Sequence, residues 1–258
     1  MPAGAYALRR GKIMGEGLRK LSDEQVDAFN REYVDADRFA RVSSRIDAAF
    51  PDGEFTFLDI GGGNGRFADQ LLERYPRARG TVLDNSELLL ARNKSHPQKT
   101  LLACSAGELD SIRDRFDLVS LHWLLHHLVG DSYAATQTNQ RRALASLNGL
   151  LTERGRISVF ENDYQGWAPD PIPTWLIYVV TASRPLAPLA RALGANTAGV
   201  GVCFNSQKTW RNLMKEAGLQ LIDHAEPDTW KRRIPLYGTF GLGLRDVKVG
   251  HYWLRSRT

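Results

Sequence analysis

The chain has 258 residues, a size that fits one α/β domain with room for an insertion. Apolar residues make up 43% and charged residues 24% of the sequence, as in an ordinary soluble globular protein. The net charge of +5 comes from scattered lysines and arginines, with one short run at residues 231–233. This distribution does not form the basic footprint of a nucleic-acid-binding protein.

Two cysteines, Cys104 and Cys203, are too few for a disulfide framework or a zinc cluster. The first residues lack the apolar run of a signal peptide. The most apolar later segment, residues 172–180, is too short to cross a bilayer. We therefore expect a cytoplasmic protein without a membrane span, as a monomer or a homodimer, in which residues 1–258 form a single domain.

Residues 1–50 are predicted to form an N-terminal helical cap. Ser22 and Gln25 have the spacing of a capping box at the start of a helix. A broken apolar stripe continues to Phe50 and indicates two helices. The turn at residues 51–53 then predicts the entrance to the first strand.

Residues 55–67 are the stretch around which the chain is organised. A run of apolar residues leads into Asp59, a glycine cluster at 61, 62, 63 and 65, and then the apolar face of a helix. A buried strand, a glycine turn and a helix N-terminus form the usual nucleotide site of an open α/β sheet. Glycines let the backbone approach a ligand closely.

The glycine spacing restricts the ligand. Gly61-Gly62-Gly63-Asn64-Gly65 reads G-x-G-x-G, and Arg66 occupies the place of the third glycine of the dinucleotide fingerprint G-x-G-x-x-G. A G-x-x-x-x-G-K-[ST] phosphate loop is absent from the sequence. The loop is therefore predicted to bind neither a dinucleotide pyrophosphate nor a nucleoside triphosphate.

Three short strands are predicted next, at residues 80–83, 100–103 and 116–121, and polar residues follow each of them. Asp84 comes about 20 residues after the glycines, where a carboxylate accepts hydrogen bonds from ribose hydroxyls. Capping of the next helix is the alternative role for Asp84, and its combination with the glycine loop favours the ribose role. Ser105 and His122 follow the other two strands.

The second half continues the alternation of strands and helices. A helix is predicted at residues 140–151 and a fifth strand at 156–160, with Glu161 and Asp163 following the strand. Residues 165–205 contain prolines and apolar segments and are predicted to form a lid or acceptor-binding insertion. Ser206 caps a last helix, and residues 219–224 and 248–255 are two final strands that pair antiparallel. The fold class is a Rossmann-like, doubly wound seven-stranded sheet, mostly parallel with an antiparallel C-terminal strand.

The segment from Leu58 to Gly65 resembles the first motif of class I S-adenosylmethionine-dependent methyltransferases, in their small-molecule type. Residues 116–128 resemble the family's fourth motif. The resemblance implies S-adenosyl-L-methionine as the cofactor. It also implies cofactor contacts from these residues: Asp59, Gly61, Gly63, Asn64, Gly65, Asp84, Asn85, Ser105, Ala106 and His122. Many relatives have Asp where Ser105 stands, so the contact to the adenine amino group falls to Ser105 or to the backbone of Ala106.

Methyl transfer from a sulfonium is an in-line displacement, which a general base assists when the acceptor is a hydroxyl. His122 directly follows the fourth strand and is the best candidate base, with a packing or substrate-shaping role as the alternative. A structural or cofactor-shielding role is favoured for His126 and His127. His127 and Glu161 are also candidate catalytic residues. His122, His126, Glu161 and Asp163 do not have the spacing of a metal site, so no metal is expected.

The leading hypothesis is methyl transfer to a small molecule at oxygen, in the biosynthesis of a specialised metabolite. Trp167, Trp175, Tyr178 and Phe204 in the insertion favour an aromatic or partly apolar acceptor. Transfer to nitrogen or carbon stays open. A nucleic-acid methyltransferase is disfavoured because the chain has no Asn-Pro-Pro-Tyr-type motif and no appended basic domain. A partner subunit that binds the cofactor without catalysis is a further alternative, and a nicotinamide oxidoreductase is disfavoured by the glycine spacing.

Overall fold

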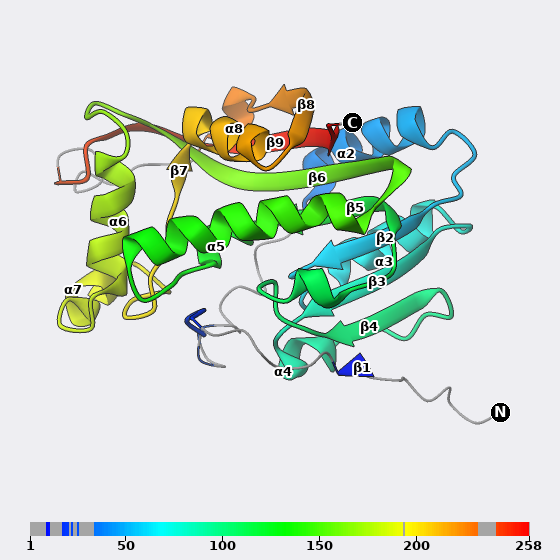
Figure 1. Ribbon diagram of the computed structural model, residues 1–258, viewed down its shortest axis with the longest axis horizontal. Coiled ribbons are helices and arrows are strands. Elements are labelled where there is room, and N and C mark those ends of the chain that lie inside the picture. The colour runs from blue at the N-terminus through cyan, green and yellow to red at the C-terminus, as the bar shows by residue number, and fades with distance from the viewer. Residues whose placement is uncertain are drawn as a thin grey trace.

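The computed structural model describes residues 9–10, 17–20, 22, 25, 34–192, 194–231 and 241–257. Within these residues the chain forms a nine-stranded sheet of order β1-β4-β3-β2-β5-β6-β9-β8, with β7 beside β6 (Figure 1). The strands are β1 (Arg9–Arg10), β2 (Thr56–Ile60), β3 (Arg79–Asp84), β4 (Lys99–Ala103), β5 (Phe116–His122), β6 (Leu151–Gly166), β7 (Asn205–Ser206), β8 (Leu219–Ala225) and β9 (Leu244–Ser256).

The sheet is parallel from β4 through β3, β2 and β5 to β6. β9 lies between β6 and β8 and is antiparallel to both. Without the two-residue strands β1 and β7, the described sheet has the seven strands that the sequence predicts. The Rossmann-like fold class is confirmed. Because five parallel strands end at one edge, their carboxyl ends build one site there.

Helices cover both faces of the sheet. Apolar side chains of α2 (Ala36–Ala49) and α3 (Arg66–Arg74) pack with Phe57 and Phe160 in one core cluster. Those of α5 (Tyr133–Ser146) and α8 (Gln207–Glu216) pack with Leu58 in the other. The remaining helical elements are α4 (Glu87–Leu90), α6 (Ile172–Ala182), α7 (Ala187–Ala192), and the 3-10 turns η2 (Leu109–Ser111), η3 (Leu125–His127), η4 (Leu147–Leu150) and η5 (Asp228–Trp230).

The insertion at residues 165–205 contributes α6 and α7, which project at the end of the molecule away from β4 (Figure 1). At the other end of the chain, Ser22 and Gln25 form the predicted capping box: the Gln25 amide donates to Ser22 Oγ, and the Ser22 amide donates to Gln25 Oε1. The helix predicted after them lies largely outside the described residues.

Two elements differ from their predicted extents. β6 has 16 residues instead of the predicted five, because β9 pairs with it from Ile157 to Gly166. Glu161 and Asp163 therefore lie inside a strand, not after one. The helix predicted to begin at residue 140 begins at Tyr133, where the Ser132 hydroxyl accepts a hydrogen bond from the Ala135 amide.

Candidate active site

One cavity of about 520 Å³ opens at the carboxyl ends of β2, β3, β4 and β5. Every predicted cofactor-binding residue lines it except Gly65. Gly65 instead is the N-cap of α3, in the left-handed conformation, and a side chain there would overlap the Asn93 side chain. Further lining residues come from the start of α3, from α4, from the N-terminal segment at residues 18–20, from the β5–η3 connection and from residues 200–201 of the insertion.

The glycine loop requires glycine for two separate reasons. Gly61 has φ of +73°, and a Cβ atom there would lie 2.9 Å from Leu124 Cδ1. Gly63 has φ of +53°, a conformation that L-residues with side chains rarely adopt. Both residues line the cavity, so the loop presents bare backbone to whatever binds there.

Asp59 is a buried carboxylate with one hydrogen-bonded oxygen. Its Oδ1 accepts a hydrogen bond of 2.7 Å from Ser120 Oγ on β5. Its Oδ2 is buried without a hydrogen-bond partner among the described residues. Burial, partly offset by the bond from Ser120, raises the pKa of Asp59 to about 6. A cationic group in the cavity would supply the missing partner and favour the ionised form.

Asp84 ends β3 and is held by the backbone of two loops. Its Oδ2 accepts a 3.0 Å hydrogen bond from the Gly63 amide, and its Oδ1 accepts one of 2.8 Å from the Ser86 amide. Burial still raises the pKa of this carboxyl above its ordinary value, with the backbone amides acting in the opposite direction. Each carboxylate oxygen has two lone pairs, so the carboxylate can accept further hydrogen bonds from a ligand. Ser86, not Asp84, caps the following helix α4.

Ser105 and Ala106 follow β4 on the cavity wall, beside Asn85 from the end of β3. The Ser105 hydroxyl accepts a hydrogen bond from the Gly107 amide, and the Ser105 amide donates to Glu108 Oε2. Both groups thus hold the turn in place. The nearby wall is apolar, with Leu18, Leu89 and Leu128 among the lining residues.

His122 ends β5 and lines the cavity beside Phe67, with ring centroids 4.5 Å apart. Its Nε2 lies 3.1 Å from Ser158 Oγ, and the same hydroxyl lies 3.0 Å from Nε2 of the fully buried His251. Burial lowers the pKa of His122 to about 3 and holds the pKa of His251 well below its ordinary value. Both imidazoles are therefore neutral near pH 7, and His122 is a weak base.

Trp123 is a cavity residue that the sequence did not single out. It has φ of +54°, a conformation that is rare for a bulky side chain. Its amide donates to the Phe160 carbonyl, and its ring stacks on Phe160 with centroids 5.4 Å apart. The guanidinium of Arg38 lies 5.5 Å from the Trp123 ring centroid. These contacts hold the turn that places His122 and Leu124 on the cavity wall.

Glu161 does not line the cavity but forms a buried pair with His126. Glu161 Oε2 lies 2.6 Å from His126 Nδ1, and Oε1 accepts a 2.7 Å hydrogen bond from the Leu125 amide. The His126 ring contacts the His127 ring at a centroid distance of 4.1 Å and the Phe204 ring at 4.6 Å. His127 lines the cavity, and burial, followed by the charge of His126, holds its pKa well below the ordinary value.

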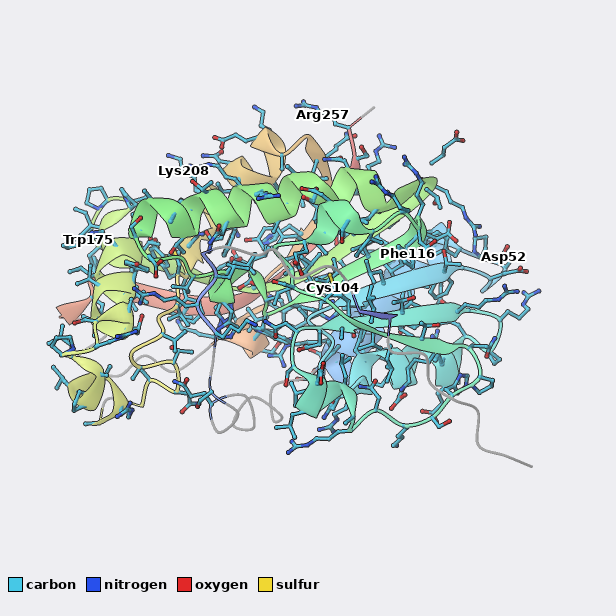
Figure 2. All side chains as sticks on the ribbon, turned by 60° about the horizontal axis from the view of Figure 1, so that its bottom comes forward. Asp52, Cys104, Phe116, Trp175, Lys208 and Arg257 are labelled. Atoms are coloured by element: carbon cyan, nitrogen blue, oxygen red, sulfur yellow. The ribbon has the colours of Figure 1, made fainter. Side chains whose placement is uncertain are left out.

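The four aromatic residues predicted for an acceptor pocket lie in different places, two exposed and two packed against other side chains or backbone. Trp167 is 69% and Trp175 is 48% exposed, and Figure 2 shows Trp175 at the outer edge of the molecule. Tyr178 is buried and donates to the Gly130 carbonyl. Phe204 packs on His126. None of the four lines the cavity within the part of the chain that the structure describes.

The histidines and carboxylates considered as a metal set are engaged elsewhere. His122 contacts Ser158, and His126 pairs with Glu161. Asp163 instead accepts a hydrogen bond from Tyr252 on β9.

No helix among the described residues has the length and hydrophobicity to span a membrane.

The glycine loop and two acidic residues from strand ends surround one cavity of this Rossmann-like sheet. This arrangement is that of a nucleotide-cofactor domain of the open α/β type. The family profile described as "Methyltransferase domain" matches residues 58–157, from β2 to β6. The predicted resemblance to class I S-adenosylmethionine-dependent methyltransferases is confirmed for this segment. No curated protein matches the chain in sequence.

Three solved structures are similar to this chain. The mitomycin 7-O-methyltransferase MmcR has 16% identity and a TM-score of 0.54, and the match covers 91% of this chain and 58% of that one. The Burkholderia thailandensis 1,6-didemethyltoxoflavin-N1-methyltransferase, with 1,6-didemethyltoxoflavin and S-adenosylhomocysteine bound, has 19% identity and a TM-score of 0.53, and the match covers 91% of this chain and 83% of that one.

The third is CalO1, a methyltransferase of calicheamicin biosynthesis with S-adenosylhomocysteine bound. It has 18% identity and a TM-score of 0.47, over 88% of this chain and 58% of that one. The chain thus spans 58% of the length of both MmcR and CalO1. MmcR and the toxoflavin enzyme share its fold.

Proposed function

We propose that this protein is an S-adenosylmethionine-dependent methyltransferase that transfers a methyl group to oxygen of a small molecule. The observation that carries the proposal is a pair of buried carboxylates at one cavity: Asp59, just before the glycine loop, and Asp84, at the end of β3 and hydrogen-bonded to the loop at Gly63. The methyltransferase domain at residues 58–157 supports it. So do the two neighbours of the same fold, which are named as an O-methyltransferase and an N-methyltransferase.

The cavity residues fit this cofactor group by group. The unpartnered, buried Oδ2 of Asp59 suits the cofactor's ammonium group. Asp84, fixed by two backbone amides, suits the ribose hydroxyls. Ser105, Ala106 and the apolar wall around them suit the adenine ring. The bound cofactor supplies an electrophilic methyl group on a sulfonium.

The assignment to oxygen rests on the Glu161–His126 pair. With Nδ1–H donating to Glu161, the imidazole is fixed in the tautomer whose Nε2 has the lone pair. A carboxylate in this position orients the ring and stabilises the imidazolium that forms when it takes a proton. His126 does not itself line the cavity, so we propose that the acceptor's hydroxyl proton reaches it through the ring of His127, which lines the cavity and contacts the His126 ring at a centroid distance of 4.1 Å, while Glu161 positions His126. His122 and His127, both neutral, shape the wall of the cavity.

Transfer to nitrogen is the second candidate, because the toxoflavin enzyme of the same fold is named as an N-methyltransferase. A neutral amine needs no base, so the Glu161–His126 pair would then be dispensable. The acceptor itself is proposed to be a partly apolar, aromatic compound of specialised metabolism. Of the four aromatic residues of the insertion, Phe204 is the one that packs on His126.

Calorimetric titration with S-adenosylmethionine and S-adenosylhomocysteine tests the cofactor. We expect one site per chain, weakened at least tenfold, about 1.4 kcal/mol, by Asp84→Asn. Asp52→Asn is the matched control, because Asp52 is an exposed carboxylate in the turn before β2. Absence of binding by the wild-type protein would refute the proposed function.

A coupled assay for S-adenosylhomocysteine release tests the acceptor class. Phenols, hydroxylated heterocycles, heterocyclic amines and free sugars form the panel. Turnover of phenols or hydroxylated heterocycles supports transfer to oxygen, and turnover of amines alone supports the second candidate. Turnover of sugars alone would contradict an apolar acceptor. Cofactor binding with no turnover on any acceptor would support a non-catalytic subunit.

A further inference from the structure

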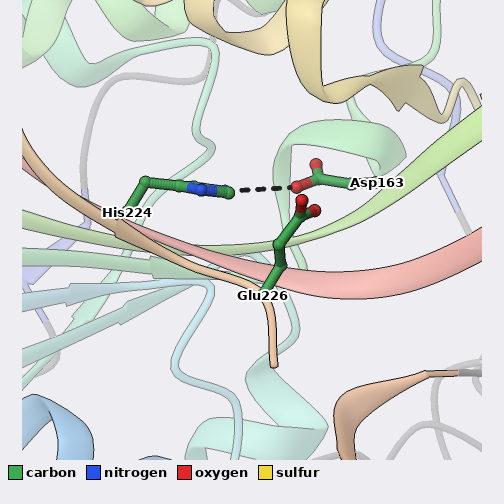
Figure 3. Close-up of side chains that lie close together, drawn as sticks. All are labelled: Asp163, His224 and Glu226. Atoms are coloured by element: carbon green, nitrogen blue, oxygen red, sulfur yellow. Dashed lines mark ion pairs between the residues drawn. The ribbon is translucent and has the colours of Figure 1, made fainter. Parts of the chain in front are cut away.

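A second cluster of ionisable side chains lies outside the cofactor cavity. Asp163 on β6, His224 on β8 and Glu226 just after β8 each place a possible ligand atom within 4.8 Å of the other two (Figure 3). Among the residues that the structure describes, this is the one group of three or more such side chains. None of the three lines the cavity.

The sheet brings the three together across an intervening strand. β9 separates β6 from β8, so a side chain on β6 must cross β9 to reach β8. Gly250 on β9 makes this crossing possible, because a Cβ atom there would overlap the Asp163 carboxylate. Tyr252, two residues further along β9, donates a 2.6 Å hydrogen bond to Asp163 Oδ2 and holds the carboxylate in this position.

Two buried atoms in the cluster have no hydrogen-bond partner. His224 Nε2 lies 3.5 Å from Asp163 Oδ2, as the dashed line in Figure 3 shows, and this is too long for a good hydrogen bond. Asp163 Oδ1 is the other unpartnered atom among the described residues. The side chains are 8% exposed for His224 and 3% exposed for Asp163. Leaving such atoms unpaired is costly, which indicates that something else satisfies them.

We propose that Asp163, His224 and Glu226 bind a divalent transition-metal ion of the Zn²⁺ type. Zn²⁺ takes imidazole nitrogen and carboxylate oxygen at about 2.0–2.2 Å, so its ligand atoms lie roughly 3–4 Å from one another. Closing the cluster to that size needs only small side-chain movements. Two carboxylates and a neutral imidazole balance the charge of the ion. Mg²⁺ and Ca²⁺ prefer oxygen ligands alone and are disfavoured by His224.

The ion would be structural. It would tie the end of β8 to β6 over Gly250, just before the chain enters η5. Trp230 of η5 packs on Phe160 and donates a 2.6 Å hydrogen bond to Asp37 of α2. The metal site therefore fixes the connection that joins β8 to the first described helix. This inference does not depend on the methyl-transfer proposal.

The test is a calorimetric titration of the full, chelator-treated chain with Zn²⁺ alone, without S-adenosylmethionine. We expect one ion per chain, with affinity at least tenfold lower in His224→Gln and in Glu226→Gln. Asp228→Asn controls for an exposed nearby carboxylate, and His96→Gln controls for adventitious histidine binding. Both controls are expected to bind within twofold of the wild type.

Titration with Co²⁺ keeps the proposal testable if a variant fails to fold. The wild-type chain should give a visible Co²⁺ spectrum that one equivalent of Zn²⁺ abolishes. Absence of stoichiometric Zn²⁺ binding, or equal affinity in His224→Gln and the controls, would overturn the proposal.

Discussion

Asp59 and His122 lie on the neighbouring strands β2 and β5, and burial shifts their pKa values in opposite directions. The pKa of Asp59 is raised to about 6 and that of His122 is lowered to about 3, so burial favours the neutral form of both. Burying Asp59 stabilises the fold below about pH 4 and loses that contribution as the pH rises through 6. Burying His122 has the reverse dependence.

The substitution His122→Asn isolates the pH dependence of stability that arises from burying His122. In the unfolded protein His122 is protonated below its ordinary pKa of about 6.5. In the folded protein it is protonated only below about pH 3. The wild type therefore loses stability relative to the variant as the pH falls from 6.5, by at most about 1.4 kcal/mol per pH unit. Urea unfolding of both proteins between pH 7 and pH 4 measures this difference. A difference that is constant over this range would show that His122 titrates normally.

A second prediction at the residue scale concerns the effect of the Glu161–His126 pair on kcat. Glu161→Gln keeps an oxygen for the Leu125 amide but removes the charge opposite His126 Nδ1. We expect kcat for a hydroxyl acceptor to fall about 100-fold or more, within the range for general bases, while the affinity for S-adenosylhomocysteine changes little. The kcat–pH profile should lose its acid limb, a change that a packing defect would not produce. Unchanged kcat would remove His126 as the base.

At the scale of elements, two described side chains of the N-terminal segment donate hydrogen bonds to the insertion: Gln25, to the Asn196 carbonyl at 2.9 Å, and Arg19. Arg19 Nη1 donates to the Ala182 carbonyl at the end of α6 and to the Val200 carbonyl, at 3.0 and 3.3 Å. The Arg19 amide also donates to the Val129 carbonyl. Leu18 to Lys20 and Val200 to Gly201 line the same cavity. Arg19 thus joins the two segments that cover the site.

Arg19→Ala tests this tie by hydrogen exchange. The amides of Gly199, Gly201 and Val202 are hydrogen-bonded to residues 181 and 197, and we expect them to exchange several-fold faster in the variant. The loss of global stability should be small, about 1 kcal/mol, because the bonds are partly exposed. Arg142→Ala, which removes an exposed arginine on α5, should leave these amides unchanged. Equal exchange in both variants would contradict the role of Arg19.

The sequence predicts the strands and the glycine loop well because their signals are local. Apolar runs, glycines and strand-end carboxylates mark β2 to β5 without knowledge of any partner. The length of β6 depends on β9, which is about 90 residues further along the chain, and the pairing of Glu161 with His126 joins β6 to η3 over 35 residues. The position of the Asp163 carboxylate over Gly250 also depends on the pairing of β6 with β9. Such contacts follow from register between strands, which the local pattern does not contain.

At the scale of the whole molecule, the two proposed sites share no residue. Ligands at separate sites without a common partner are expected to stabilise a fold additively. S-adenosylhomocysteine at 100 times its Kd should add about 2.7 kcal/mol to the free energy of unfolding, and Zn²⁺ at the same excess should add a similar amount. At about 2–4 °C per kcal/mol, each ligand raises Tm by roughly 5–11 °C.

Thermal unfolding with each ligand and with both, in the wild type and two variants, tests this independence. Asp84→Asn should lose about half or more of the S-adenosylhomocysteine shift and keep the Zn²⁺ shift. His224→Gln should do the reverse, because His224 lies on β8, at the edge of the sheet beyond β9, whereas Asp84 ends β3. A variant that loses both shifts would show that the two sites are coupled through the sheet. Equal and additive shifts would instead show that the antiparallel end of the sheet is stabilised separately from the parallel part that holds the cofactor.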